Sequence, residues 1–349
     1  MVDRVGWRRA NPLAVGLWSL AAASHALART LAQFTLARGA LGATEAMGTP
    51  TAVKTVAVLF PNEVRAMAYG LINSASNVGA IITPLVIPLI ALKIGWANAF
   101  VLTGGLGFVW VVAWFALRAN LAEAAQPAAT VVVARPPITD LLADRGTWAV
   151  AGARVLSDNV WWLLLYWMPD LFHRVFHLSM QAYGPPLALI YAASGIGAVL
   201  AGLASNRLLA AGVSLNATRK WLLFAGAVLV TPVCFAPWAN GYWVAAAILG
   251  LTLAGHQVFS VNVFALASDV TAPGSVATVV AIAAFSGNIS GMVMLQVAGW
   301  TLDHGYGYAP LLGWASVSYL LGVGWVQLLL PRVRAASAET KAGPATAEG

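Results

Sequence analysis

The chain has 349 residues, of which 60% are hydrophobic and 9% are charged, and its formal net charge is +7. An ordinary soluble domain has about 25% charged residues. This composition, with a mean hydropathy of +0.78, therefore excludes a soluble protein and predicts an all-α, polytopic membrane helix bundle. The basic residues are dispersed through short loops and form no stripe, so we expect no nucleic-acid partner.

Ten apolar runs are long enough to cross a membrane, which takes about 20 mostly apolar residues. The polar segment 118–146 predicts a cytoplasmic linker between an incomplete N-terminal bundle, 1–117, and a six-helix C-terminal bundle, 147–331. The tail, 332–349, is small and polar, which is typical of disorder. The predicted spans, four before the linker and six after it, are 12–30, 35–59, 68–92, 97–117, 147–169, 185–208, 219–236, 242–265, 277–300 and 308–330.

The distribution of Lys and Arg residues predicts the orientation of these spans. With the N-terminus in the cytoplasm, most basic residues fall in cytoplasmic loops, and the opposite side holds Lys93, Arg174 and, at the end of the first span, Arg29. The positive-inside rule then places both termini in the cytoplasm. We expect the protein to lie in the inner cell membrane. A secretory signal is the alternative for the first span, because a basic start and an apolar stretch precede "SHALA". The length of that stretch favours a span.

Two loops in the predicted bundles are alike. The opening segment 3–9, "DRVGWRR", and the loop 202–220, "GLASNRLLAAGVSLNATRK", each combine an acidic or amide residue, an arginine, a glycine and closing basic residues. Transporters are often built from two related bundles. Because 202–220 follows the second span of its bundle, aligning the loops predicts that the chain lacks the two helices that come before residue 3.

Both loops resemble the signature loops of the major facilitator superfamily, with Asn206 where an aspartate is common. Within that superfamily, the segment 37–84, "ARGALGATEAMGTPTAVKTVAVLFPNEVRAMAYGLINSASNVGAIITP", is similar to the anion:cation symporter family. The segments 156–169, "LSDNVWWLLLYWMP", and 254–270, "AGHQVFSVNVFALASDV", resemble its hexuronate-transporter branch. Together these motifs cover most of the chain.

The resemblance implies a major-facilitator bundle whose ten spans correspond to helices 3 to 12, with Asp3, Arg4, Gly6 and Arg8 in a gating loop. It implies a secondary transporter that imports an organic anion, a hexuronate such as glucuronate or galacturonate, by proton symport with alternating access. The family's first helix carries an acidic and a basic residue without counterparts here, which argues against a two-proton stoichiometry. Aldonates, Na⁺ coupling, and a truncated non-transporting bundle or substrate-binding sensor stay open as alternatives.

The motif "RGALGATE" places two charged residues inside a predicted span. Arg38 and Glu45 are seven residues apart, which is within about 20° of two full helical turns, so both project from one face. Each such charge costs roughly 2.5–3.5 kcal/mol in a membrane, which makes it a functional hypothesis by default. An ion pair that holds two helices together is the alternative. The resemblance matches Glu45 to an acidic residue implicated in proton coupling and Arg38 to the arginine that precedes it.

Polar side chains in three other spans are candidate substrate contacts, because a sugar acid needs many hydrogen bonds. Small polar residues also hold membrane helices together, which is the alternative for Asn73, Ser76 and Asn77. The resemblance matches Ser76 to a position that contacts substrate. The complete set of candidates is Asn73, Ser76, Asn77, Asp158, Trp162, Gln257 and Asn262.

Two of these candidates lie in "RVLSDNVWWLLLYW". Asp158 lies near the middle of its span and can form a plain intrahelical pair with Arg154, four residues earlier. Trp162, one turn further, can pack against the apolar face of a pyranose ring, although tryptophan also anchors helices at membrane interfaces. In "AGHQVFSVNVFALASD" we expect an interior histidine at His256 and a loop role for Asp269.

No enzyme signature is present in the sequence. It has no Walker loop and no Cys/His cluster with metal spacing, so we expect neither an enzyme nor a cofactor nor a metal site. The single cysteine, Cys234, lies in an apolar run. We expect it to be a small, buried hydrophobic side chain. We expect the partners to be a small sugar acid, protons and the lipid bilayer, and the protein to be a monomer.

Overall fold

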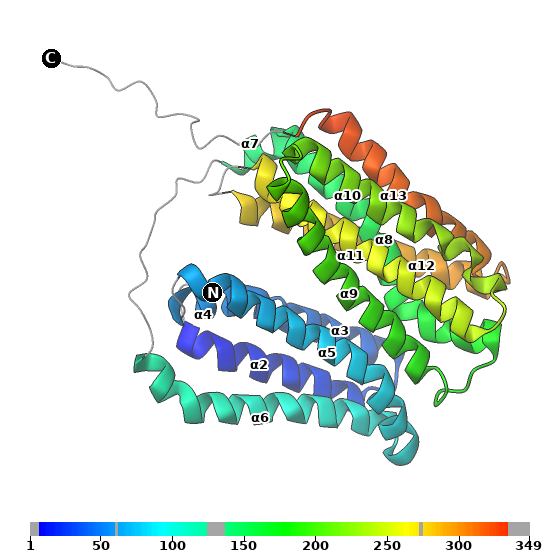
Figure 1. The fold of residues 1–349 in the computed structure, drawn as a ribbon. Helices are drawn as coiled ribbons and strands as arrows, with labels where there is room; N and C mark the ends of the chain where they lie inside the picture. Colours follow the sequence, from blue (N-terminus) through cyan, green and yellow to red (C-terminus); the bar gives the residue numbers. More distant parts are fainter. Residues whose placement is uncertain (1–6, 60–61, 124–136, 272–274, 334–349) are drawn as a thin grey trace. The chain divides into compact units, whose positions relative to one another are not determined.

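A computed structural model describes residues 7–59, 62–123, 137–271 and 275–333. Throughout these ranges the regular elements are helices, which confirms the all-α prediction (Figure 1). The chain divides into two compact units, Met1–Val131 and Val132–Gly349, so the boundary falls inside the predicted linker. The predicted tail, apart from its first two residues, lies outside the described residues.

In the first unit, α2 is the central helix and packs against α3, α4 and α6. Its C-terminal end continues into η1, where the buried His25 stacks on Phe100 of α6 with ring centroids 4.9 Å apart. The elements of this unit, drawn blue to cyan in Figure 1, are α2 (Trp7–Ser24), η1 (His25–Leu27), α3 (Leu31–Glu45), α4 (Gly48–Leu59), α5 (Asn62–Ile94) and α6 (Trp96–Glu123).

The predicted span 35–59 is broken into two helices. A capping box starts α3. The Thr30 side chain accepts from the backbone N–H of Gln33, and the Gln33 side chain accepts from the backbone N–H of Thr30. The helix ends at Glu45, and α4 begins at Gly48. Pro50 has no N–H to donate to the carbonyl of residue 46, so the continuous helical ladder is interrupted at this turn. The break therefore lies directly beside Glu45.

In the second unit, α8 packs against α11, α12 and α13, while α11 also packs against α9 and α10. Asp144 caps the start of α8 by accepting from the backbone N–H of Thr147, and Ser214 caps α10 in the same way. The elements are α7 (Ile138–Ala143), α8 (Arg145–Phe176), α9 (Gly184–Ala210), α10 (Leu215–Val230), η2 (Thr231–Trp238), α11 (Tyr242–Val270), α12 (Val276–Asp303) and α13 (Ala309–Leu329).

Helices occupy all ten predicted spans, and in the part of the chain that the structure describes, six of these spans are long and apolar enough to cross a membrane by length and composition. Those six lie in α6, α9, α10 with η2, α11, α12 and α13. The helix α8 is outside this set because Arg154, Asp158 and Asn159 lower the hydropathy of its middle. At about 1.5 Å per residue its 32 residues extend for about 48 Å. The total of ten spans stays a prediction.

Candidate functional site

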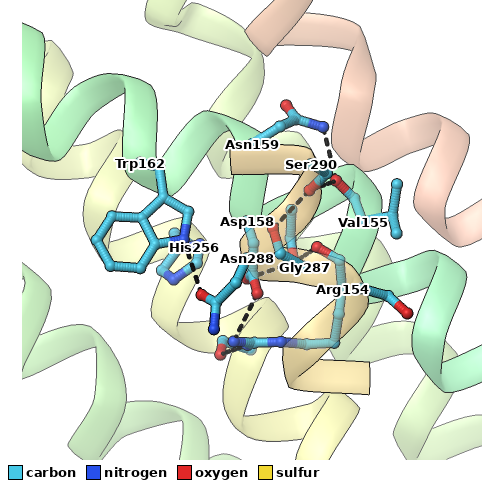
Figure 2. A network of polar contacts seen from close by, with 12 residues as sticks. Arg154, Val155, Asp158, Asn159, Trp162, His256, Gly287, Asn288 and Ser290 are labelled. Atoms are coloured by element: carbon cyan, nitrogen blue, oxygen red, sulfur yellow. Dashed lines mark hydrogen bonds and ion pairs between the residues drawn. The ribbon is translucent and has the colours of Figure 1, made fainter. Parts of the chain in front are cut away.

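A buried ion pair lies in the middle of α8. The Arg154 Nη2 atom is 2.8 Å from Asp158 Oδ2, and the two side chains are 14% and 3% exposed (Figure 2). Because the residues are four apart on one helix, their side chains meet on the same face. Both charges are therefore held inside the helix bundle, where an unpaired charge is costly.

The guanidinium of Arg154 also contacts α11. Its Nη1 donates to the Ser260 hydroxyl at 2.7 Å, and its Cζ lies 4.8 Å from the centroid of the Phe264 ring. The Nε–H is buried and has no hydrogen-bond partner among the described residues. The Nε–H of Arg154 is consequently a donor that is not used in this arrangement.

The helix α8 also packs tightly against α12, at two glycines. A Cβ atom on Gly287 would lie 2.1 Å from Asp158 Oδ2, and one on Gly291 would lie 2.0 Å from Trp162 Cδ1. The Trp162 indole donates to Asn288 Oδ1 at 3.2 Å, as Figure 2 shows. Two predicted site residues, Asp158 and Trp162, thus lie together along this seam, and only glycine permits the approach.

A buried hydrogen-bonded chain links α11, α13 and α8 next to this seam. The hydroxyl of Tyr319 lies 2.6 Å from His256 Nδ1 and donates to the carbonyl of Ser157 at 3.1 Å. The imidazole also stacks on Trp161, with centroids 4.7 Å apart. His256 therefore has the packed, hydrogen-bonded surroundings expected of an interior histidine. The sequence signal for Tyr319 is only a phenol hydroxyl beside Ser316 and Ser318 in an otherwise apolar run.

The two remaining candidates on α11 face other helices. Gln257 donates to the Ser194 hydroxyl of α9 at 3.2 Å. Asn262 is fully buried, donates to the carbonyl of Val258, and accepts weakly from Arg219 of α10 at 3.5 Å. The structure thus brings neither residue into contact with Asp158.

Asp269 does not lie in a loop, as the sequence suggested, because α11 continues to Val270. Its Oδ2 is 2.6 Å from Nε of Arg219, whose Nη1 also donates to the Ser205 hydroxyl at 2.7 Å. A second ion pair therefore joins three helices, α9, α10 and α11, at the end of the unit that was predicted to be cytoplasmic.

A third ion pair lies near the C-terminal end of α8. Arg174 Nε is 2.8 Å from Asp170 Oδ2, which also accepts from the Tyr308 hydroxyl at 2.5 Å. The hydrogen bond to Asp170, together with the charge of that carboxylate, raises the pKa of Arg174. This pair is half-exposed, and it repeats the i,i+4 spacing of the buried pair.

The predicted residues of the first unit are described only in part. Arg38 and Glu45 are exposed on α3, and Arg8 is exposed at the start of α2. The side chains of Asn73, Ser76 and Asn77 lie outside what the structure describes, although the α5 backbone is placed there. The other gating-loop residues, Asp3, Arg4 and Gly6, lie outside the described residues altogether.

Residues 1–295 match the model of the Major Facilitator Superfamily. The hexuronate transporter of Escherichia coli (strain K12) is 28% identical over 346 residues, which cover 92% of this chain and 78% of that protein. The D-galactonate transporter of Escherichia coli O6:H1 is 26% identical over 344 residues, covering 92% and 79%.

Among solved structures, a bacterial homolog of the human lysosomal transporter Spinster has the same fold. In its inward-facing and occupied conformation it matches with a TM-score of 0.68 and 17% identity, over 94% of this chain and 82% of that one. Fold class and superfamily are therefore those that the sequence motifs predicted.

Proposed function

Since the chain belongs to the Major Facilitator Superfamily, we propose that it is a secondary active transporter that imports a sugar acid together with protons by alternating access. The proposed substrate is a hexuronate, glucuronate or galacturonate. The proposed location is the inner cell membrane, with both termini in the cytoplasm and the protein a monomer. The names of its relatives, a hexuronate transporter and a D-galactonate transporter, support a sugar acid as the substrate class.

The observation that carries this proposal is the Arg154 guanidinium inside the second unit. It is a fixed positive charge in a membrane-spanning bundle, and one of its N–H groups has no partner among the described residues. Arginine binds carboxylates through parallel hydrogen bonds, so this group is suited to the single carboxylate of a hexuronate. Trp162 lies one turn beyond Asp158, where its ring can pack against a pyranose.

Neutral polar groups supply the hydrogen bonds that sugar hydroxyls need. In the second unit these are Gln257 and Asn262 on α11, and in the first unit Asn73, Ser76 and Asn77 on α5. In the arrangement described, Gln257 and Asn262 use their amides on protein partners. Their participation therefore requires another state of the alternating-access cycle, in which the helices have shifted.

Proton coupling follows from the energetics of anion entry. Bringing one anion into an inside-negative cell costs about 2.3 kcal/mol per 100 mV, and one co-transported proton cancels that charge. We assign this proton to Glu45, with Arg38, on the same face of α3, as its partner in the coupling. Both side chains are exposed on their helix, beside the break between α3 and α4.

The test is uptake of radiolabelled glucuronate and galacturonate into proteoliposomes containing the full chain, with an alkaline interior. We expect accumulation above the equilibrium level that collapses when a protonophore is added, with protein-free liposomes as the control. Absence of both accumulation and counterflow for every sugar acid tried contradicts the proposal. Binding without flux identifies a non-transporting sensor.

An aldonate is the second candidate substrate, and the D-galactonate transporter among the relatives favours it. Competition separates the two classes in the same vesicles. If unlabelled galactonate blocks glucuronate uptake only at concentrations far above those of galacturonate, the substrate is a hexuronate. The reverse order assigns the transporter to aldonates.

A further inference from the structure

We propose that Asp158 is a second proton-binding site, in addition to Glu45, and that the Arg154–Asp158 pair works by exchanging counter-ions. In the substrate-free state the carboxylate of Asp158 neutralises Arg154. When the sugar acid enters, its carboxylate takes over the guanidinium, and Asp158 accepts a proton. This inference rests on the proposed function, because it needs an anionic substrate.

The burial of Asp158 gives the exchange its driving force. Its side chain is 3% exposed, its Oδ2 is pressed against the backbone at Gly287, and its charged partner is Arg154. An ionised carboxylate that loses its counter-ion in such a place is strongly disfavoured relative to the neutral acid. Loss of Arg154 to another anion therefore forces protonation of Asp158.

Arg154 is placed to change partners. It is more exposed than Asp158, at 14%, and its Nε–H is not used by any described residue. The contacts with Ser260 and the Phe264 ring come from α11 and do not depend on Asp158. These contacts hold the guanidinium in position while its anionic partner is exchanged.

Among the described residues that face Asp158 from the other helices, none is acidic. From α11 the titratable group is His256, and from α13 it is Tyr319, and these two are hydrogen-bonded to each other. From α12 the facing residues are neutral, namely Gly287 and Asn288. Among the described residues around the pair, Arg154 is the group with a fixed positive charge.

Charge is conserved in the exchange. Before it, the pair is neutral and the substrate carries one negative charge. Afterwards the guanidinium and the substrate carboxylate form a neutral pair, and Asp158 is a neutral acid. One proton from the solution has formed an O–H bond on Asp158, and no other covalent bond changes. With the Glu45 proton, each anion then enters with two protons and one net positive charge. The sequence alone argued against this stoichiometry because the acidic residue of the family's first helix has no counterpart here, and Asp158 supplies the second site in its place. A potential of about 60 mV then changes accumulation about tenfold.

The decisive measurement is the number of protons taken up per glucuronate bound, followed with a pH indicator in weakly buffered detergent solution of the full chain. We expect Asp158→Asn to bind glucuronate and to take up about one proton fewer than the unmodified protein. Arg154→Gln is expected to weaken binding at least tenfold. His256→Gln, which removes the other titratable group on α11, is expected to retain the proton uptake.

A matched control lies on the same helix. Asp170 and Arg174 form an i,i+4 pair at 2.8 Å, like Arg154 and Asp158, but at the exposed end of α8. Asp170→Asn is expected to leave the proton count unchanged. Unchanged proton uptake in Asp158→Asn, or its loss in His256→Gln alone, overturns the proposal.

A second measurement tests the second proton-binding site if Asp158→Asn does not fold. In proteoliposomes of the unmodified protein without a pH gradient, an inside-negative potassium diffusion potential is expected to drive glucuronate accumulation. Electroneutral uptake overturns the inference while leaving proton symport intact. Failure of the unmodified protein to bind or carry any sugar acid instead overturns the proposed function.

Discussion

Asp158 Oδ2 occupies the space that a side chain on Gly287 would need, because a Cβ atom there would lie 2.1 Å away. The ion pair of α8 therefore exists in its observed position only because α12 carries a glycine at this level. The same relationship recurs one turn along, between Trp162 and Gly291. The seam between α8 and α12 thus positions both predicted contact residues.

Gly287→Ala is expected to destabilise the protein by about 1–3 kcal/mol, the usual cost of overpacking a tight core. It should also displace Asp158 and lower glucuronate affinity. The thermal midpoint of the purified full chain and a binding titration measure the two effects. Gly299→Ala, on the same helix, is the control, since its Cβ would meet Trp167 at an ordinary 3.9 Å. Equal stability of the two variants contradicts the packing argument.

Glu45→Gln is expected to abolish accumulation driven by an inside-negative potential while sparing counterflow. The amide is shaped like the protonated acid but cannot release its proton, so each anion then enters with the Asp158 proton alone and without net charge. Counterflow of glucuronate in the same vesicles is the internal control for a folded, active protein. Accumulation at the unmodified level removes Glu45 from the coupling mechanism.

Much of the helical framework follows from the sequence because apolar length and charge breaks are local properties. The predicted range 242–265 corresponds to α11, which ends five residues later, at Val270. Contacts within one helix can also be predicted from the sequence, and the i,i+4 spacing offered an Arg154–Asp158 pair as one of two interpretations of Asp158. The break after Glu45 was not predicted, although Pro50 lies close to it. The segment 35–59 is long and apolar enough for a single span, and this property does not reveal the loss of one backbone hydrogen bond.

Partners from other helices were not predicted, because they depend on how each helix is rotated about its axis. His256, Gln257 and Asn262 lie within seven residues of one another on α11, yet they face different helices. Residues next to each other on a helix point about 100° apart. An apolar helix surrounded by others gives no hydrophobic face from which the rotation can be read. The contact of Asn262 with Arg219, 43 residues away, has no sequence signal.

Trp162→Ala is expected to raise the KM for glucuronate about two- to tenfold, which corresponds to an aromatic contact of about 0.5–1.5 kcal/mol. Trp162→Phe keeps a ring but loses the hydrogen bond to Asn288, so its KM should lie between those of the unmodified protein and Trp162→Ala. Initial uptake rates at several substrate concentrations give these values. Trp300→Phe, at an exposed position on α12, is the control. If Trp162→Ala alters stability but not KM, the ring only anchors the helix.

Removing one partner of the Arg219–Asp269 pair is expected to be worse than removing both. Among the described residues, Asp269→Asn leaves the cation of Arg219 with the neutral Ser205 and Asn262 as hydrogen-bond partners. Breaking a fully buried pair costs roughly 3–5 kcal/mol. The side chains here are 9% and 18% exposed, so solvent screening reduces the expected loss to about 1–3 kcal/mol.

A double-mutant cycle measures this coupling through thermal midpoints of the full chain in detergent. In Arg219→Gln/Asp269→Asn no charge is left unpaired, so its midpoint should lie above that of Asp269→Asn alone. Additive losses from the two single changes contradict the coupling, because residues that act through one contact are not additive. Such additivity means that α9, α10 and α11 are held together at this end by packing rather than by the ion pair.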